Sequence, residues 1–315
     1  MDFYERIGPA SLGSRMRRLG DRLAEDAKPI YALYGTQLQP RWFPVIYFLA
    51  QEGAHPVTVI AEQIGQTHAS VSQIVAEMVK NGYAGLRKDA SDGRKTVVSL
   101  SRKGLASARK LDTQCIDAAA AVQNLQAEVG IDLWNTLAAI EHALAGHNLY
   151  HRLLREKIKR ETKVRIVDFL PRHAKAFRTL NEDWIRTYFK MEEADRRALD
   201  DPERTFLQAG GFILVAMTGN KPVGVCALLP HGDGCFELAK MAVAPAARGN
   251  GIGWLLGDAA IGKARQAGAR KLYLESNTRL ESAIRLYRKL GFREITGSLP
   301  SPYERCNIQM ERDLA

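Results

Sequence analysis

The sequence has few cysteines, no long apolar run and no low-complexity segment. Its four cysteines, Cys115, Cys226, Cys235 and Cys306, form no C-x-x-C pair and have no histidine at zinc-finger spacing, so we expect neither a disulfide framework nor a metal site. No stretch approaches the roughly 18 apolar residues of a membrane span. Two acidic residues stand among the first six, which is unlike a secretory signal. We therefore expect a cytoplasmic protein without a membrane partner.

The remaining composition is that of a globular protein with an excess of positive charge. The chain has 315 residues, 46% of them hydrophobic and 25% charged, and a chain of this length predicts two domains. The 45 Lys and Arg residues exceed the 35 Asp and Glu residues, giving a formal net charge of +10. Such an excess favours polyanionic partners.

The first half of the chain shows apolar positions at helical spacing, interrupted by two short strand patterns. A turn-rich segment joins these strands, which we place at Gly85–Lys88 and Thr96–Leu100. We predict an all-α domain with a β-hairpin over residues 1–150 and a basic helical linker over residues 151–162. The expected helices are Met16–Tyr34, Phe43–Gln51, Val57–Ile64, Val71–Val79, Arg102–Val129 and Ile131–Lys159.

Short helices followed by a basic hairpin are typical of a winged helix-turn-helix, in which the second helix of the pair enters the major groove of DNA. Between Lys80 and Lys110, nine basic residues stand against two acidic ones, at the place where phosphate contacts would lie. A solvated charged face is the alternative explanation. The candidate DNA-binding residues are His68, Ser70, Ser72 and Gln73 for base edges, and Arg87, Lys88, Arg94 and Lys95 for the backbone.

Short motifs in this helix and hairpin carry a family resemblance. They are Gln-Thr-His-Ala-Ser-Val-Ser at 66–72, Asn-Gly-Tyr at 81–83, Asp-Gly-Arg at 92–94 and Leu-Ser-Arg-Lys-Gly at 100–104. Through them this half of the chain resembles the MarR family of winged-helix regulators, with Ser101 in place of the usual threonine. The resemblance implies that Arg94 enters the minor groove. It also implies a homodimer that binds a palindromic site of double-stranded DNA.

The second half of the chain alternates between strand and helix patterns. Three consecutive strand patterns between residues 212 and 243 predict an antiparallel meander, and we predict an α/β domain with a mixed, largely antiparallel sheet over residues 163–315. After the third strand, Arg-Gly-Asn-Gly-Ile-Gly at 248–253 opens a helix. Glycines let successive backbone N–H groups close on a phosphate, and the helix N-terminus adds attraction.

Three further motifs extend this signal. Met-Ala-Val-Ala-Pro at 241–245 precedes the glycine-rich turn, Leu-Tyr-Leu-Glu-Ser-Asn at 272–277 supplies the next strand, and 283–292 reads Ala-x-x-Leu-Tyr-x-x-x-Gly-Phe. Together they resemble the GNAT family of N-acetyltransferases, although Leu280 stands where the family often has asparagine. The resemblance implies acetyl-CoA as the cofactor. The residues expected to bind it are Met241, Ala242, Val243, Arg248, Gly249, Asn250, Gly251, Ile252, Gly253, Asn277 and Tyr287.

Transfer of an acetyl group to an amine requires a base for the ammonium proton and an acid for the thiolate. The resemblance implies that Glu237 is the base, acting directly or through water, and that Tyr287 is the acid. Alternatively, Glu237 is a strand residue paired with a basic neighbour and Tyr287 packs as an ordinary aromatic residue.

The acceptor is the least readable part of the sequence. Trp184, Tyr188 and Phe189 could form an aromatic wall for a cationic amine, although core packing explains the same stripe. Tyr303 and Arg305 could hold a carboxylate. Glu237 and Asn277 complete the expected substrate residues. His147 and His151 share a helical face but have no third ligand, so no metal is expected.

These observations favour a bifunctional protein, a DNA-binding transcriptional regulator fused to an acetyl-CoA-dependent N-acetyltransferase. Its acceptor would be a small amine or amino-acid-like molecule, acetylated by direct transfer. One alternative is a repressor whose second domain is a catalytically silent acyl-CoA or ligand sensor. Another is an enzyme whose winged helix serves only for dimerisation. Salt-dependent DNA binding would separate this last alternative from the first hypothesis.

Overall fold

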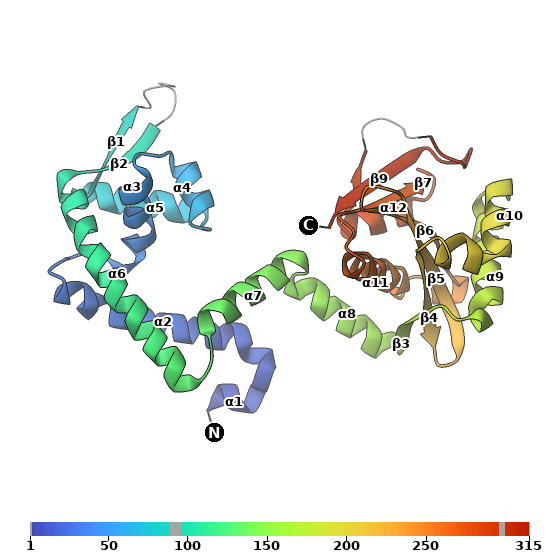
Figure 1. Ribbon diagram of the computed structural model, residues 1–315, viewed down its shortest axis with the longest axis horizontal. Helices are drawn as coiled ribbons and strands as arrows, with labels where there is room; N and C mark the ends of the chain where they lie inside the picture. The colour runs from blue at the N-terminus through green and yellow to red at the C-terminus, as the bar shows by residue number, and fades with distance from the viewer. Residues whose placement is uncertain (1, 89–95, 296–299, 315) are drawn as a thin grey trace. The chain divides into compact units, whose positions relative to one another are not determined.

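The computed structural model describes residues 2–88, 96–295 and 300–314 and contains two compact units, which divide after Leu133 (Figure 1). Helix α7, Leu133–Gly146, begins at the division. The helices and strands of the first unit are α1 (Phe3–Ile7), α2 (Leu12–Leu33), α3 (Phe43–Glu52), α4 (Val57–Gln63), α5 (His68–Lys80), β1 (Ala84–Lys88), β2 (Thr96–Leu100) and α6 (Arg102–Val129).

The first unit packs α3, α4 and α5 around one apolar core and attaches the β1-β2 hairpin directly after α5. Thr67 caps α5 by accepting a hydrogen bond from the Ser70 backbone N–H at 3.2 Å, which fixes where the helix begins. Val71, Ile74, Val75 and Met78 on one face of α5 are buried, as its spacing predicts. The opposite face of α5 therefore remains available.

The second unit is a seven-stranded sheet with helices on both faces. The strand order is β3-β4-β5-β6-β7-β9-β8, and every neighbouring pair is antiparallel except β6 and β7. Its elements, after α7, are α8 (Leu149–Thr162), β3 (Val164–Asp168), α9 (Ala174–Tyr188), α10 (Glu193–Asp200), β4 (Phe212–Thr218), β5 (Lys221–Pro230), β6 (Cys235–Val243), α11 (Ile252–Gln266), β7 (Lys271–Ser276), α12 (Glu281–Lys289), β8 (Arg293–Glu294) and β9 (Ile308–Asp313).

The two faces of this sheet bury two separate cores. Along β4, Leu214 and Ala216 pack against α11, whereas Ile213 and Val215 pack against the side covered by α9 and α10 (Figure 1). This alternation is what period-2 side-chain geometry requires of a strand buried on both faces. The predicted fold class, an all-α domain with a hairpin followed by an α/β domain with a mixed, largely antiparallel sheet, is confirmed.

Two local expectations need correction. The stretch expected as one helix from Ile131 to Lys159 breaks between α7 and α8, because Asn148 caps α8 by accepting from the His151 backbone N–H at 3.0 Å. Arg152 closes the end of α7 by donating to the carbonyls of Ala143 and His147. Helix α10 was not expected, since the pattern after Lys190 gave no separate helix. Over the described residues, no helix combines the length and apolarity that crossing a membrane requires.

Candidate functional site

The strands β6 and β7 separate at the centre of the sheet. Their parallel pairing ends at Glu237 and Tyr273, although β6 continues to Val243 and β7 to Ser276. On its other edge β6 contains a bulge opposite Cys226, and Lys240 there has a left-handed φ of 52°. Diverging strands leave a gap in the sheet into which a ligand can enter, and a bulge is a common way to create such a gap.

Glu237 lies where the pairing ends, opposite Leu229 of β5 and Tyr273 of β7. Burial raises the pKa of its carboxyl from 4.5 to about 7, and the nearby carboxylate of Glu275 adds to the rise, while Lys240 opposes it. Near neutral pH the side chain therefore exists in both protonation states. A carboxyl with this property in a pocket is a candidate general base.

Tyr287 of α12 lines the same pocket as Glu237. Burial raises the pKa of its phenol to about 12, so the hydroxyl keeps its proton at neutral pH. Its ring packs edge-on against Phe292, and within the described part of the chain its hydroxyl makes no hydrogen bond. A protonated hydroxyl without a protein acceptor is available to donate to a ligand.

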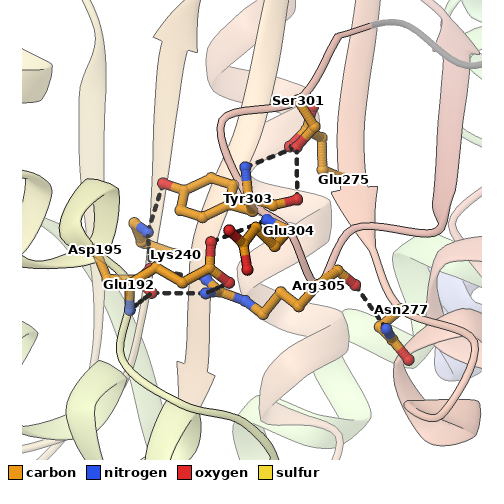
Figure 2. Close-up of polar contacts among 9 residues, drawn as sticks. All are labelled: Glu192, Asp195, Lys240, Glu275, Asn277, Ser301, Tyr303, Glu304 and Arg305. Atoms are coloured by element: carbon orange, nitrogen blue, oxygen red, sulfur yellow. Dashed lines mark hydrogen bonds and ion pairs between the residues drawn. The ribbon is translucent and has the colours of Figure 1, made fainter.

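Lys240, Tyr303 and Arg305, which line the pocket, belong to a network of ion pairs and hydrogen bonds (Figure 2). Asp195 of α10 accepts from Lys240 Nζ at 2.7 Å and from both terminal nitrogens of Arg305, at 2.6 and 2.7 Å. Arg305 also donates to Glu192 at 2.9 Å, and Lys240 donates to the Tyr303 hydroxyl at 2.8 Å. Burial alone would raise the pKa of Asp195, but these bonds outweigh burial and hold that pKa below its ordinary value.

This network holds the left-handed backbone of Lys240 in place. A left-handed lysine costs of the order of 1 kcal/mol or more, and its side chain is tied at both Asp195 and Tyr303. Both terminal nitrogens of Arg305 donate hydrogen bonds to carboxylates, those of Asp195 and Glu192. A role for Tyr303 and Arg305 in holding a substrate carboxylate therefore stays a prediction, and it would require these ion pairs to rearrange.

The other expected substrate residues divide into two groups. Trp184 and Phe189 line the pocket with Glu237, whereas Tyr188 is not part of its lining and is exposed. Asn277 lies at the pocket wall, but its amide closes a loop, since it donates to the Arg305 carbonyl at 2.6 Å and accepts from the Arg279 backbone N–H at 2.9 Å. Its predicted contact with a ligand remains untested.

A larger groove continues from this pocket past Met241 and Tyr287, which line both. Its other lining residues include most of the expected cofactor-binding set, Val243, Arg248, Gly249, Gly251, Ile252 and Gly253. Gly249 and Gly251 have left-handed φ values of 82° and 76°, which side chains rarely adopt. The glycine turn therefore leads directly into the N-terminus of α11. Backbone N–H groups at such a helix N-terminus can bind a phosphate.

Three expected cofactor contacts do not line this groove, and one of them, Asn277, lines the smaller pocket instead. Ala242 is buried within the sheet, and Asn250 is exposed on the turn, where its amide donates to the Ala247 carbonyl at 3.5 Å. Arg248 lines the groove, and its Nε donates to the Val243 carbonyl at 3.0 Å. The residues fit a pyrophosphate through the backbone of the turn rather than through every side chain.

In the first unit, the base-reading candidates lie at the start of α5. His68 and Gln73 are exposed, and Ser70 and Ser72 are half-buried. Arg87 and Lys88 are exposed on β1, paired with Val97 and Thr96 of β2. The predicted contacts Arg94 and Lys95 lie outside the described residues.

Sequence reasoning missed several pocket residues. Glu275 lines the pocket and accepts hydrogen bonds from Tyr273 at 2.9 Å and from Ser301 at 2.6 Å. Lys240, which also lines the pocket, and its partner Asp195, which does not, were missed too. The only signal for Glu275 is its place at the end of β7, two residues before Asn277. Across the described ranges, no cluster of three or more His, Cys, Asp or Glu residues could hold a metal ion.

Both halves of the chain match known families. The acetyltransferase (GNAT) family model matches residues 177–292, and the MarR family model matches residues 36–95. N-acetyltransferase YjgM of Escherichia coli K12, described as uncharacterized, is 31% identical over 149 residues, covering 46% of this chain and 89% of that protein. N-acetyltransferase 8F1 of Rattus norvegicus is 32% identical over 104 residues, 31% of this chain and 47% of that protein. A solved GNAT-family acetyltransferase from Staphylococcus aureus Mu50 aligns with a TM-score of 0.46 and 24% identity, over 48% of this chain and 99% of that one.

Proposed function

Since this chain belongs to the GNAT acetyltransferase family and carries a MarR-family domain, we propose that it is a DNA-binding regulator that also transfers an acetyl group from acetyl-CoA to a small amine. The proposed catalytic activity rests on one observation. Glu237 and Tyr287 line the same pocket, at the place where β6 and β7 separate. Acetyl-CoA, when bound, supplies the thioester whose acetyl group is transferred.

Glu237 and Tyr287 divide the proton transfers between them. The Glu237 carboxylate, with its pKa raised to about 7, takes a proton from the acceptor ammonium, directly or through a water. Backbone N–H groups of β6 near Met241 and Val243 would stabilise the oxyanion formed when the neutral amine adds to the thioester carbonyl. As the carbon–sulfur bond breaks, the Tyr287 hydroxyl would give its proton to the sulfur and would regain one from the nitrogen, which loses its second proton as the amide forms. No covalent acyl-enzyme is needed, and Cys226, whose pKa burial raises to about 12, is an unsuitable nucleophile.

The pocket suits the amine end of a small acceptor. Its volume of about 90 Å³ makes it the smaller of the two cavities that Tyr287 lines, since the groove has about 630 Å³. Glu237 and Glu275 line it, and the cations Lys240 and Arg305 are already paired with acids. The resulting negative balance favours a cationic amine, with Trp184 and Phe189 providing aromatic faces.

An assay of thiol release from acetyl-CoA tests this proposal. The acceptors are simple amines, diamines, amino acids, dipeptides and basic peptides, each with the full-length wild type and with Glu237→Gln. We expect turnover with amines that carry no carboxylate near the nitrogen, and loss of that turnover in Glu237→Gln. Binding of acetyl-CoA without turnover on any acceptor would instead favour a ligand sensor.

For the first unit, we propose that the exposed start of α5 reads base edges and that the hairpin contacts phosphates. Arg87→Ala/Lys88→Ala is expected to weaken DNA binding and to lower the slope of log affinity against log salt by about 2 per protomer, about 1 for each lost contact. Fluorescence anisotropy with labelled DNA at several salt concentrations measures this.

The control for that experiment removes one positive charge elsewhere. Lys175→Ala, on α9 of the second unit, is exposed and should leave the salt slope unchanged. An unchanged slope in Arg87→Ala/Lys88→Ala would mean that the hairpin does not contact phosphates.

We also propose that the first unit forms a homodimer. Leu12, Met16, Leu19 and Leu23 make an exposed apolar stripe at helical spacing along α2, and the distal part of α6 exposes Val122, Leu125 and Val129. Monomeric proteins rarely leave so many apolar side chains in contact with water. Light scattering should give twice the chain mass of 35.0 kDa, and Leu19→Asp/Leu23→Asp should give the single mass. A monomeric wild type would contradict the dimer.

A further inference from the structure

Helix α8 lines the groove that we assign to acyl-CoA, although it precedes the matched acetyltransferase region. Tyr150, His151, Leu154 and Ile158 face this groove from α8. Ile158 approaches the glycine turn so closely that a Cβ on Gly251 would lie 2.6 Å from its Cδ1. The turn and α8 therefore form one continuous surface.

A buried carboxylate holds α8 in this position. Asp258 of α11 is 3% exposed and accepts from Arg155 Nε of α8 at 2.6 Å. The same carboxylate lies 3.0 Å from Nε2 of His147, at the junction of α7 and α8. At its other end α8 is joined to β3 by the single residue Lys163. Helix α8 is thus fixed to the helix whose N-terminus follows the glycine turn.

The place of α8 along the groove indicates which part of the ligand it meets. Tyr287 and Met241 stand where the groove joins the acceptor pocket, so the acyl end of the ligand belongs there. With the pyrophosphate on the glycine turn, the nucleotide meets other lining residues of the groove. These include residues of α8, Trp254, and Arg285 and Lys289 of α12.

The chemistry of these lining residues suits an adenosine phosphate. The rings of His151 and Trp254 lie 5.9 Å apart and those of Tyr150 and His151 lie 5.6 Å apart, which provides flat faces for a base. Arg285 and Lys289, four residues apart on α12, add positive charge to the lining of the groove. Aromatic faces and cations together are what a base and its phosphates require.

We propose that α8, which precedes the matched acetyltransferase region, forms one wall of the nucleotide subsite. This rests on the proposed acyl-CoA function of the groove. The Arg155 and His147 contacts with Asp258 of α11 hold α8 and its junction with α7 in the position that lines the groove.

Binding measurements on full-length variants test whether α8 contacts the nucleotide. Tyr150→Ala/His151→Ala is expected to weaken the affinity for coenzyme A and for adenosine 3′,5′-bisphosphate about 10-fold, while pantetheine binding stays unchanged. Leu149→Ala/Leu153→Ala is the matched control, because both leucines lie on α8, are exposed and do not line the groove. Equal coenzyme A affinity in the two double variants would overturn the proposal.

Hydrogen exchange of the wild type provides a readout independent of substitution. Addition of coenzyme A should slow exchange of backbone amides in both α8 and the glycine turn. Protection of the turn without protection of α8 would overturn the nucleotide wall and leave the acyl-CoA function intact. Absence of coenzyme A binding by the wild type would overturn both.

Discussion

Glu237→Gln is expected to lower kcat/KM for acetyl transfer by about 10²- to 10³-fold and, at the same time, to stabilise the protein at pH 8. The first effect follows because glutamine cannot take a proton from the acceptor ammonium. The second follows because the buried carboxyl is costly to ionise, as its pKa near 7 indicates. If Glu237 served only in packing, its replacement would not lower kcat/KM and raise stability together.

The stability effect has a defined pH window. In the unfolded chain the carboxyl ionises near its ordinary pKa of 4.5, whereas in the folded protein it ionises near 7. The wild type therefore loses stability relative to the variant as pH rises from 4.5 to 7. This difference corresponds to about 3 kcal/mol for a fully buried group, and the partial solvent contact of Glu237 reduces the expected gain to about 1 to 2 kcal/mol.

Urea denaturation at pH 4.5 and pH 8, together with thiol release, measures both effects. The free energy of unfolding should differ between wild type and variant at pH 8 and converge at pH 4.5. Glu294→Gln, exposed on β8, is the control and should change neither turnover nor stability. A Glu237→Gln variant that keeps full turnover would remove Glu237 as the base.

Tyr287→Phe is expected to lower kcat by about 10²-fold while the dissociation constant for coenzyme A changes less than about 3-fold. The phenylalanine keeps the ring contact with Phe292 but loses the hydroxyl that protonates the leaving sulfur. Because burial holds the pKa of this phenol at about 12, the wild-type hydroxyl stays a donor throughout the neutral range.

Leaving-group acidity provides a second readout for Tyr287. An acyl donor with a more acidic thiol needs less proton transfer to sulfur, so the loss caused by Tyr287→Phe should shrink with such a donor. Tyr47→Phe removes a phenol from the first unit and serves as the control. Undiminished kcat in Tyr287→Phe with acetyl-CoA would exclude the tyrosine as the acid.

The parts of the site that could be predicted from sequence are those whose residues are contiguous. The glycine turn at 248–253 and the tyrosine segment at 283–292 are each short and continuous in sequence, so their resemblance to family motifs could be seen without the fold. The buried face of α5 follows from its helical periodicity in the same way.

The remaining parts depend on contacts between distant segments. Asp195 meets Lys240 across 45 residues and Arg305 across 110 residues, and no local pattern indicates these meetings. Tyr188 and Phe189 are neighbours at the end of α9 and their rings lie 6.4 Å apart, yet only Phe189 lines the pocket. By contrast, Asn148 was a local cap signal that could have placed the break between α7 and α8.

The dependence of kcat/KM on pH tests the central claim most directly, with the wild type, Glu237→Gln and Glu275→Gln assayed on the same amine. We predict that the wild-type rate rises through an apparent pKa near 7, that this limb disappears in Glu237→Gln, and that it moves to lower pH in Glu275→Gln, where a repelling carboxylate is removed. The same limb in all three proteins would contradict the assignment of Glu237 as the base.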